Sequence, residues 1–282
     1  MLNHREYLDK ALQRAARAEP LSGDSVEFFR SIYAYQAERL EAYAGLAFDG
    51  DRIRRGEMPV VNAEAFSIAT GEYELLREGI DALLSILSGH HRGMNFDRLR
   101  ESLSGGIDPM NRAARALLGR DFDVLSAQSQ VCGLGVEEYI FILVNWLKPF
   151  FAVLAEKYGA DVRQDEWMEP RCPVCGFYPD MAKIVGAKDG RRFLHCALCE
   201  YEWHFKRIAC PVCDNEDTEK LGYFAVEGET AYRVDYCDKC RGYIKTVQLG
   251  KFSEPDNCDL TVENILTTDL DAAAMKKGYA RP

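Results

Sequence analysis

The sequence predicts an α+β protein with several domains, an N-terminal helical bundle followed by two small metal-binding modules in tandem. Two observations support this prediction. Apolar residues in roughly the first 165 positions recur at steps of three and four, which is the spacing of one face of an α-helix. Eight of the ten cysteines then lie between Cys172 and Cys240, in four C-x-x-C pairs. We expect a helical domain at 1–168, a first four-cysteine module at 169–208, a second at 209–250, and a C-terminal tail with a short helix at 251–282.

The helical half is expected to contain a series of amphipathic helices. Gln36 is the one polar residue on the apolar face of the second helix, so it should find a hydrogen-bond partner there and have a structural role. An aspartate N-cap followed three residues later by a glutamate begins this helix, and an Asp-Pro pair begins a later one. The expected helices run near Tyr7 to Ala18, from Asp24 to Tyr43, from Phe66 to Leu87 with Gly89 as the end, from Asp108 to Leu118, and from Val136 to Tyr158 as one helix or two.

The apolar run Tyr139–Leu147 resembles part of a membrane span, but Asn145, Lys148 and Pro149 interrupt it. It is shorter than the roughly 18 to 20 apolar residues that a spanning helix needs. It predicts the buried central helix of a bundle, kinked at Pro149, and no stable membrane insertion.

The chain is acidic, with a formal net charge of −10 and a pI near 5.1. Between Arg171 and Lys245, twelve Lys or Arg residues balance twelve Asp or Glu residues. A module that binds nucleic acid should instead have a basic stripe, because phosphate contacts dominate its affinity. The N-terminus lacks the apolar core of a signal peptide. These features predict a cytoplasmic protein without a nucleic-acid partner.

The sequence contains no phosphate-binding loop and no Ser/His/Asp arrangement with a supporting context, so we do not expect an enzyme. The two modules differ in charge, which suits a protein partner better than a phosphate backbone. The first is basic through Arg191, Arg192, Lys206 and Arg207, and the second is acidic through Glu216, Asp217, Glu219, Glu227 and Glu229.

The cysteine spacing predicts two sites with four thiolates each. Cys-Pro-Val-Cys occurs at Cys172 and again at Cys210, and each copy is followed by a second C-x-x-C and an aromatic strand. Twenty residues separate the first two pairs and twenty-three the last two, as in rubredoxin-like or zinc-ribbon modules. Crossed pairing between the modules is the alternative arrangement. The expected ligands are Cys172, Cys175, Cys196 and Cys199 in one site, and Cys210, Cys213, Cys237 and Cys240 in the other.

A metal ion suits these modules because about forty residues cannot build much of a core. Structural zinc supplies on the order of 10 to 16 kcal/mol in such modules. A disulfide framework is typical of secreted chains, and a thioredoxin-type redox pair needs one C-x-x-C at a helix N-terminus, so neither is favoured. Cys132 and Cys258 stand alone and are expected to be buried thiols, and His90 and His91 are expected at a helix end, where imidazoles meet the last carbonyls.

A longer motif distinguishes the first module from a generic ribbon. The string H-C-x-L-C-x-x-x-W-H-x-x-R-x-x-C runs from His195 to Cys210 and resembles the formate dehydrogenase accessory protein family. The ending Gly278-Tyr-Ala-Arg281 is similar to the end of that family, and the helical half with Trp146-Leu-Lys-Pro149 is compatible with it. The resemblance covers nearly the whole chain.

The resemblance implies a non-enzymatic, cytoplasmic maturation factor that acts on the catalytic subunit of a formate dehydrogenase. It also implies two ions, of iron, at the eight cysteines; spacing alone leaves zinc as the alternative. Only the first module has the rubredoxin-like glycine after its leading pair, Gly176, whereas Asp214 follows Cys213, which makes iron less expected there. Trp203, His204 and Arg207 match the motif, and are expected to pack beside the metal site or to contact a partner.

Three classes of function remain open from the sequence: a maturation protein, a rubredoxin-like electron carrier and a zinc-ribbon nucleic-acid binder. The missing basic stripe counts against the nucleic-acid binder. The large helical domain is superfluous for an electron carrier, which a reversible visible absorption change would support.

Overall fold

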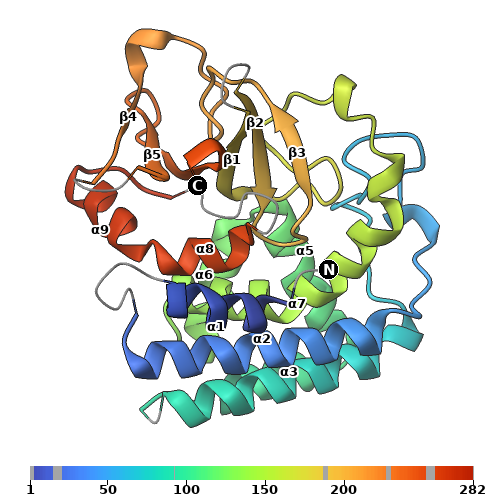
Figure 1. Cartoon of the computed structure of the whole chain (residues 1–282). Helices are drawn as coiled ribbons and strands as arrows, with labels where there is room; N and C mark the ends of the chain where they lie inside the picture. Colours follow the sequence, from blue (N-terminus) through green and yellow to red (C-terminus); the bar gives the residue numbers. More distant parts are fainter. Residues whose placement is uncertain are drawn as a thin grey trace. The chain divides into compact units, whose positions relative to one another are not determined.

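The computed structural model describes residues 3–14, 21–91, 93–186, 190–226, 230–251 and 258–281 (Figure 1). The chain divides into two compact units. The helical unit contains Gly23–Ala160 and the short segment Val174–Gly176. The sheet unit contains Met1–Ser22, Asp161–Pro173 and Phe177–Pro282. The predicted order of a helical part followed by a sheet with two cysteine clusters is confirmed, and the domain boundaries at 168, 208 and 250 stay predictions.

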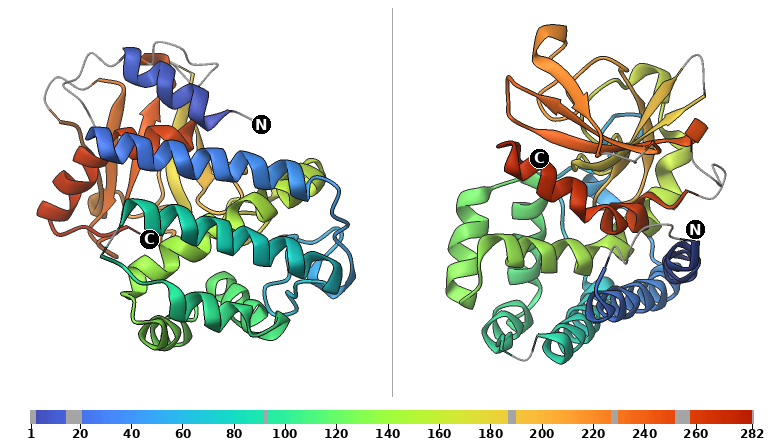
Figure 2. Two further views of the ribbon diagram at one scale, coloured as in Figure 1. Left: turned by 90° about the horizontal axis from the view of Figure 1, so that it is seen from below. Right: turned by 60° about the vertical axis from the view of Figure 1, so that its left-hand side comes forward.

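The helical unit is built from helices joined by short connections, except for the long segment between Tyr43 and Thr70. The long helices α2 and α3 lie side by side, and both contact α7 (Figure 2). The unit contains α2 (Gly23–Tyr43), α3 (Thr70–His90), α4 (Asp97–Ser104), α5 (Ile107–Gly119), α6 (Phe122–Cys132) and α7 (Val136–Tyr158), with a short 3-10 helix at Gly50–Arg52.

Several predicted helix ends differ from the structure. Asp24 lies in the first turn of α2 and not at its N-cap, because the helix begins at Gly23. Helix α3 begins at Thr70, four residues after Phe66, and continues past Gly89 to His90. Asp108 lies inside α5, which starts one residue earlier. Capping residues locate a helix to within a turn, and tertiary contacts decide the final residue. The predicted Tyr7–Ala18 helix is present as α1, His4–Arg14, and the residues after it lie outside the described part.

Helix α7 forms the centre of the helical unit. Its Trp146 is fully buried and donates from Nε1 to the Leu76 carbonyl at 2.8 Å, and Tyr158 donates to the Phe48 carbonyl at 2.6 Å. The helix continues through Pro149. Among the described residues, Val136–Asp161 is the one helix long and apolar enough to cross a membrane, but 72% of its most apolar window is buried in the protein. Burial of this kind is typical of a core helix.

Two polar pairs are buried inside the helical unit. Gln36 donates from Nε2 to the Asn145 side chain at 3.0 Å, so the expected hydrogen-bond partner is present. Arg52 and Glu72 form a two-fold ion pair at 2.7 and 2.8 Å, and both side chains are only 4% exposed. Loss of either partner would destabilise the unit, because the remaining charge would be buried without a counter-charge.

The sheet unit contains one six-stranded sheet in the order β3-β2-β1-β6-β5-β4. Each module contributes three consecutive antiparallel strands, and the two halves join through the parallel pair β1 and β6. The two modules are therefore fused into one sheet. The strands are β1 (Pro179–Val185), β2 (Arg191–Cys196), β3 (Glu202–Phe205), β4 (Leu221–Phe224), β5 (Tyr232–Cys237) and β6 (Tyr243–Gln248).

Helices from both ends of the chain cover this sheet (Figure 1). Helix α8 (Leu260–Leu266) packs on β1, and α9 (Thr268–Lys276) packs on β5 and β6. Helix α1 contacts α8. Tyr7 and Tyr232 both donate to the Glu263 carboxylate at 2.5 Å, which joins α1, β5 and α8. The first helix of the chain thus belongs to the sheet unit.

A histidine in α1 makes a second connection within the sheet unit. His4 contacts Asp259 through Nδ1 at 2.5 Å and Glu200 through Nε2 at 3.0 Å. Burial by itself would lower the pKa of His4, but the two carboxylates outweigh it and raise the pKa to about 10. His4 is therefore a charged partner at neutral pH.

We expect the stability supplied by His4 to depend on pH. A histidine whose pKa is raised on folding contributes fully below its unfolded pKa of about 6.5, and the contribution is lost as pH rises towards 10. The difference in unfolding free energy between the native protein and His4→Gln should narrow by at least about 1 kcal/mol between pH 6.5 and 10, because each pKa unit corresponds to about 1.36 kcal/mol. Denaturant titrations at both pH values measure it.

The control is His90→Gln, at an exposed position at the end of α3. Its difference from the native protein should stay constant over the same pH range. A difference for His4→Gln that also stays constant would show that the His4 ion pairs do not stabilise the fold.

Candidate metal centres

The four C-x-x-C turns share one backbone geometry. In each, the N–H of the first cysteine donates to the carbonyl five residues later, and these acceptors are Phe177 at 2.9 Å, Tyr201 at 3.0 Å, Asn215 at 2.8 Å and Gly242 at 3.0 Å. In three of the turns the residue after the second cysteine also donates to the carbonyl of the first, from Glu200 at 3.1 Å, Asp214 at 2.9 Å and Arg241 at 2.8 Å. The internal repeat in the sequence therefore corresponds to a repeat in structure.

The residue after each second cysteine is left-handed. Its φ is +75° at Gly176, +61° at Glu200, +55° at Asp214 and +61° at Arg241. Glycine adopts this conformation without cost, whereas other residues pay about 1 to 2 kcal/mol. Asp214 nevertheless forms the same turn as Gly176, so the missing glycine does not change the backbone of the second module.

The structure brings the eight cysteines together in the two groups that their spacing predicts. Within each group the four sulfurs lie within 4.8 Å of one another. Four sulfurs held tetrahedrally at about 2.3 Å from one ion would be about 3.8 Å apart. Measured separations are 3.4 Å for Cys172 and Cys199, 3.6 Å for Cys210 and Cys240, and 3.9 Å for Cys213 and Cys237. The two groups could therefore hold two ions, one in each module, without crossed pairing.

Backbone amides point at several of these sulfurs. Leu198 and Cys199 donate to Cys196 at 3.4 and 3.5 Å, Val212 donates to Cys210 at 3.4 Å, and Gly242 donates to Cys240 at 3.3 Å. Such bonds favour the thiolate form and fix the direction of the sulfur. The backbone of these turns thus orients the sulfurs for binding a cation.

The second group differs from the first in its exposure. All four cysteines of the first group are buried, whereas Cys213 and Cys240 are partly exposed. Burial raises the pKa of Cys210 well above its usual range and that of Cys240 to about 11. Burial opposes ionisation of Cys213 too, but the Asn215 amide and the neighbouring sulfurs outweigh it and lower its pKa. An ion must therefore displace protons from this group, and a lower pH weakens its binding.

The three other residues of the predicted site lie around β3. Trp203 is fully buried and donates from Nε1 to the Glu169 carbonyl at 3.0 Å, so it fixes the start of the first module. His204 packs against Phe193 with ring centroids 5.7 Å apart. Arg207 is exposed and lies over Gly190, where a Cβ would come within 2.3 Å of its guanidinium. Packing thus accounts for Trp203 and His204, and the exposed Arg207 lies beside Gly190.

The lone cysteines and the histidine pair lie outside both groups. Cys132 and Cys258 are buried, and burial raises the pKa of each thiol. His90 and His91 both pack edge-on against Phe28, at 5.4 and 5.3 Å. The lone cysteines are buried thiols as expected, whereas the imidazoles at the end of α3 contact Phe28 and Ser31 rather than the last carbonyls of the helix.

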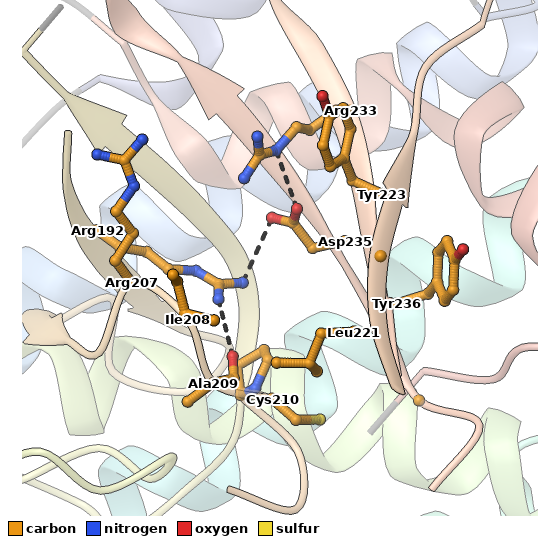
Figure 3. Close-up of a pocket in the computed structure, with 13 residues that line it drawn as sticks. Arg192, Arg207, Ile208, Ala209, Cys210, Leu221, Tyr223, Arg233, Asp235 and Tyr236 are labelled. Atoms are coloured by element: carbon orange, nitrogen blue, oxygen red, sulfur yellow. Dashed lines mark hydrogen bonds and ion pairs between the residues drawn. The ribbon is translucent and has the colours of Figure 1, made fainter. Parts of the chain in front are cut away.

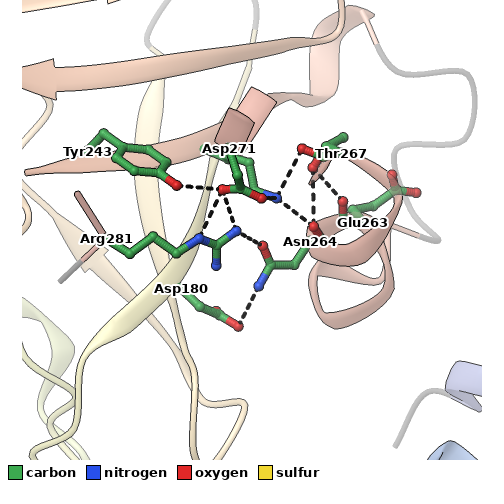
Figure 4. Close-up of polar contacts among 8 residues, drawn as sticks. Asp180, Tyr243, Glu263, Asn264, Thr267, Asp271 and Arg281 are labelled. Atoms are coloured by element: carbon green, nitrogen blue, oxygen red, sulfur yellow. Dashed lines mark hydrogen bonds and ion pairs between the residues drawn. The ribbon is translucent and has the colours of Figure 1, made fainter. Parts of the chain in front are cut away.

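A polar network near the C-terminus was missed by sequence reasoning (Figure 4). Lys245 is buried and donates to Asp271 at 2.7 Å and to the Asn264 carbonyl at 2.5 Å, and burial lowers its pKa to about 8. Arg281 reaches the same Asp271 at 2.6 Å and Asn264 at 2.8 Å. In the sequence, only the Gly278-Tyr-Ala-Arg281 motif pointed to this region. The motif alone does not show that Arg281 bonds Asp271 and Asn264.

The segment Gly278–Arg281 also supports the second cysteine group. Ala280 accepts from the Tyr243 amide at 3.1 Å and donates to the Arg241 carbonyl at 2.9 Å, as a short parallel bridge beside Gly242. The Arg241 guanidinium lies 4.1 Å from the centre of the Tyr279 ring. The end of the chain is therefore built onto the turn that follows Cys240.

A family model described as the central domain of FdhE matches residues 171–207, which contain the whole first cysteine group. A protein named "Protein FdhE homolog" from Yersinia pestis (strain Pestoides F) is 32% identical over 213 residues, covering 74% of this chain and 60% of the relative. This chain is FdhE-like. A protein of the same name from Aquifex aeolicus (strain VF5) is 31% identical over 166 residues, or 56% of each chain. These alignments span less than two thirds of either relative.

The fold of this FdhE-like chain is also that of a solved structure. The crystal structure of the FdhE protein from Pseudomonas aeruginosa matches it with a TM-score of 0.65. The match covers 99% of this chain and 92% of the other, at 24% sequence identity. The helical part, the sheet and their order are therefore shared over nearly the whole length.

We predict two metal ions in each fully folded chain, one in each cysteine group. The reason is the near-tetrahedral spacing of both sets of sulfurs. Elemental analysis of protein prepared without oxygen measures the content and separates iron from zinc. Cys175→Ala should reduce the content to one ion, whereas Cys132→Ala, outside both groups, should leave two. One ion in the native folded chain would contradict the prediction.

Removal of the ions should unfold the sheet unit and leave helices α2 to α7. The helical unit closes its own core, with Phe66, Phe150 and Phe151 in mutual ring contact, whereas the small modules depend on their metal. A chelator titration followed by far-ultraviolet circular dichroism measures this. Most of the helical circular dichroism signal should remain. Its loss would show that the helical unit does not stay folded without the modules.

Proposed function

We propose that this protein is an accessory factor for the assembly of an active formate dehydrogenase and that it acts by binding the catalytic subunit of that enzyme. The observation that carries the proposal is the FdhE central-domain match on the first metal module, together with similarity to FdhE homologues along most of the chain. The two modules form one continuous sheet. A sheet fixed by two ions offers a rigid docking surface, which favours specificity.

We infer that the protein performs no chemistry on a small substrate. The perturbed basic groups in the sheet unit already serve the fold. Lys245 is held by Asp271, Asn264 and Thr267, and His4 is held by Glu200 and Asp259. A general acid or base must instead reach a reacting atom of the substrate. These contacts support a binding role.

Iron is our proposed metal in both groups, with zinc as the alternative. An ion of either element would cross-link two turns through four thiolates. The residues of this chain supply the rest: they present the sulfurs at 3.4 to 3.9 Å from one another and aim backbone amides at them. This geometry supports a structural use of the metal.

An electron carrier is the second candidate, because Cys213 and Cys240 are partly exposed. A redox metal near the surface can exchange electrons with a partner, whereas a purely structural site gains nothing from exposure. A reversible change in visible absorption on reduction, at an unchanged metal content, would favour this candidate.

The proposed function predicts the effect of cysteine substitutions. Cys175→Ala combined with Cys240→Ala opens both groups and should lower cellular formate dehydrogenase activity at least about tenfold, since loss of structural metal unfolds small modules. Transcription of the enzyme should be unchanged. Cys132→Ala with Cys258→Ala is the matched control, because both residues are buried thiols outside the two groups.

Activity and copurification of the catalytic subunit decide the outcome together. Full activity in cells that lack this protein, with no catalytic subunit recovered on the native chain, would reject the assembly function. The electron carrier would then be the better explanation.

A further inference from the structure

A pocket of about 140 Å³ lies within the sheet unit, where the second module begins (Figure 3). Its floor is formed by β2 and β5, through Arg192, Arg233 and Asp235. The loop that leads into Cys210 forms a wall, and β4 forms another through Tyr223. Cys210 of the second cysteine group is among the residues that line it.

More of the residues that line the pocket are basic than acidic. Three arginines, Arg192, Arg207 and Arg233, line it together with one carboxylate, Asp235, in a chain of net charge −10. Asp235 accepts a hydrogen bond from the Thr246 hydroxyl at 2.6 Å. It also forms ion pairs with Arg233 at 2.9 Å and Arg192 at 3.4 Å. It therefore orients the arginines and has little capacity left for a cationic ligand.

The two arginines on the floor have different uses. Arg192 is 4% exposed and donates to the Ala209 carbonyl at 3.1 Å, so it supports the wall of the pocket. Arg233 faces Asp235 through an ion pair of 2.9 Å from Nε, which does not have the geometry of a hydrogen bond, and lies 4.6 Å from the centre of the Tyr223 ring. Within the described residues, no oxygen accepts a hydrogen bond from this guanidinium. Guanidinium groups held in this way suit a carboxylate, which they can bind through two parallel bonds.

The rim of the pocket is apolar and adjoins an edge of the sheet. Tyr223 is 65% exposed and Ile208 is 60% exposed. Strand β4 ends the sheet, and in the part of the chain that the structure describes no strand pairs with its outer side. Such an edge presents backbone groups to which an extended peptide can add.

We propose that the pocket and the outer edge of β4 bind an extended acidic segment of a partner polypeptide, with one carboxylate side chain entering between Arg207 and Arg233. This inference rests on the proposed function for the identity of the partner, the catalytic subunit. In an added strand, alternate side chains face the same way, so acidic residues at every second position would all point to the pocket side. Tyr223 and Ile208 would cover the apolar parts of the segment.

A peptide fits better than nucleic acid. A nucleic acid would need many phosphate contacts along a basic stripe, but the pocket is a single small basic site in an acidic chain. A peptide strand needs one anchored side chain and an open edge, and both are present here.

The test uses the full-length, metal-loaded protein and two probes. One probe is a fluorescein-labelled decapeptide of alternating glutamate and valine, followed by anisotropy. The other is the purified catalytic subunit. Arg207→Glu should weaken both about tenfold, as expected when an attractive charge contact becomes repulsive, and Tyr223→Ala about threefold. Raising the salt concentration should weaken binding of the native chain more than that of Arg207→Glu.

Arg191→Glu is the matched control. Arg191 precedes Arg192 on β2, is exposed and therefore points to the opposite face of the sheet, so the same change in charge should leave both affinities unchanged. Metal content and circular dichroism show that each variant is folded.

Each outcome decides a separate point. Equal peptide binding by the native chain and Arg207→Glu, or none by the native chain, overturns the pocket inference even if the catalytic subunit binds. Peptide binding that depends on Arg207, without binding of the catalytic subunit, supports the pocket as a peptide-binding site and rejects the proposed function. If a labelled single-stranded oligonucleotide binds through Arg207 more tightly than the peptide, the pocket belongs to nucleic acid.

Discussion

The fold of the sheet unit depends on the closure of the two cysteine groups. In each module the first C-x-x-C turn precedes the three strands, and the second lies between the last two, so four sulfurs join the beginning of the module to its final hairpin. The strands are only four to seven residues long, so a cross-link between them is a large contribution to the stability of the sheet. An ion shared by four thiolates would supply such a cross-link in each module, and the pairing of β1 with β6 makes one sheet of the two modules.

Local patterns in the sequence predicted the features that depend on local chemistry. The C-x-x-C spacing gave the grouping of all eight cysteines, because a turn of four residues fixes two sulfurs whatever surrounds it. The apolar spacing gave α7 from Val136 to Tyr158 to the residue. The short strands β1, β2, β4 and β5 were not predicted, because each depends on a neighbour distant in sequence. Helix α1 has the pattern of any amphipathic helix, and the contacts of His4 and Tyr7 with distant carboxylates place it in the sheet unit.

The two modules have diverged around a common backbone. The first group is fully buried, and its motif tryptophan is bonded to the Glu169 carbonyl where the chain enters the module. The second is more open, and the pocket with its excess of arginine lies next to it. Each module contributes one edge strand, β3 or β4, so the modules differ in the exposure of their cysteines and in the pocket beside the second group.

Two of the left-handed residues that follow the second cysteines connect their turns to the first and last helices of the chain. Three of the four are not glycine, although each pays about 1 to 2 kcal/mol for its conformation. Each carries a side-chain contact that glycine could not make: Glu200 pairs with His4, Asp214 with Lys206, and Arg241 with the Lys277 carbonyl. Two of these contacts fasten the first and the last helices of the chain to a metal turn. The side-chain contacts thus offset the strain at the three residues that are not glycine, and Gly176 adopts the same conformation without strain.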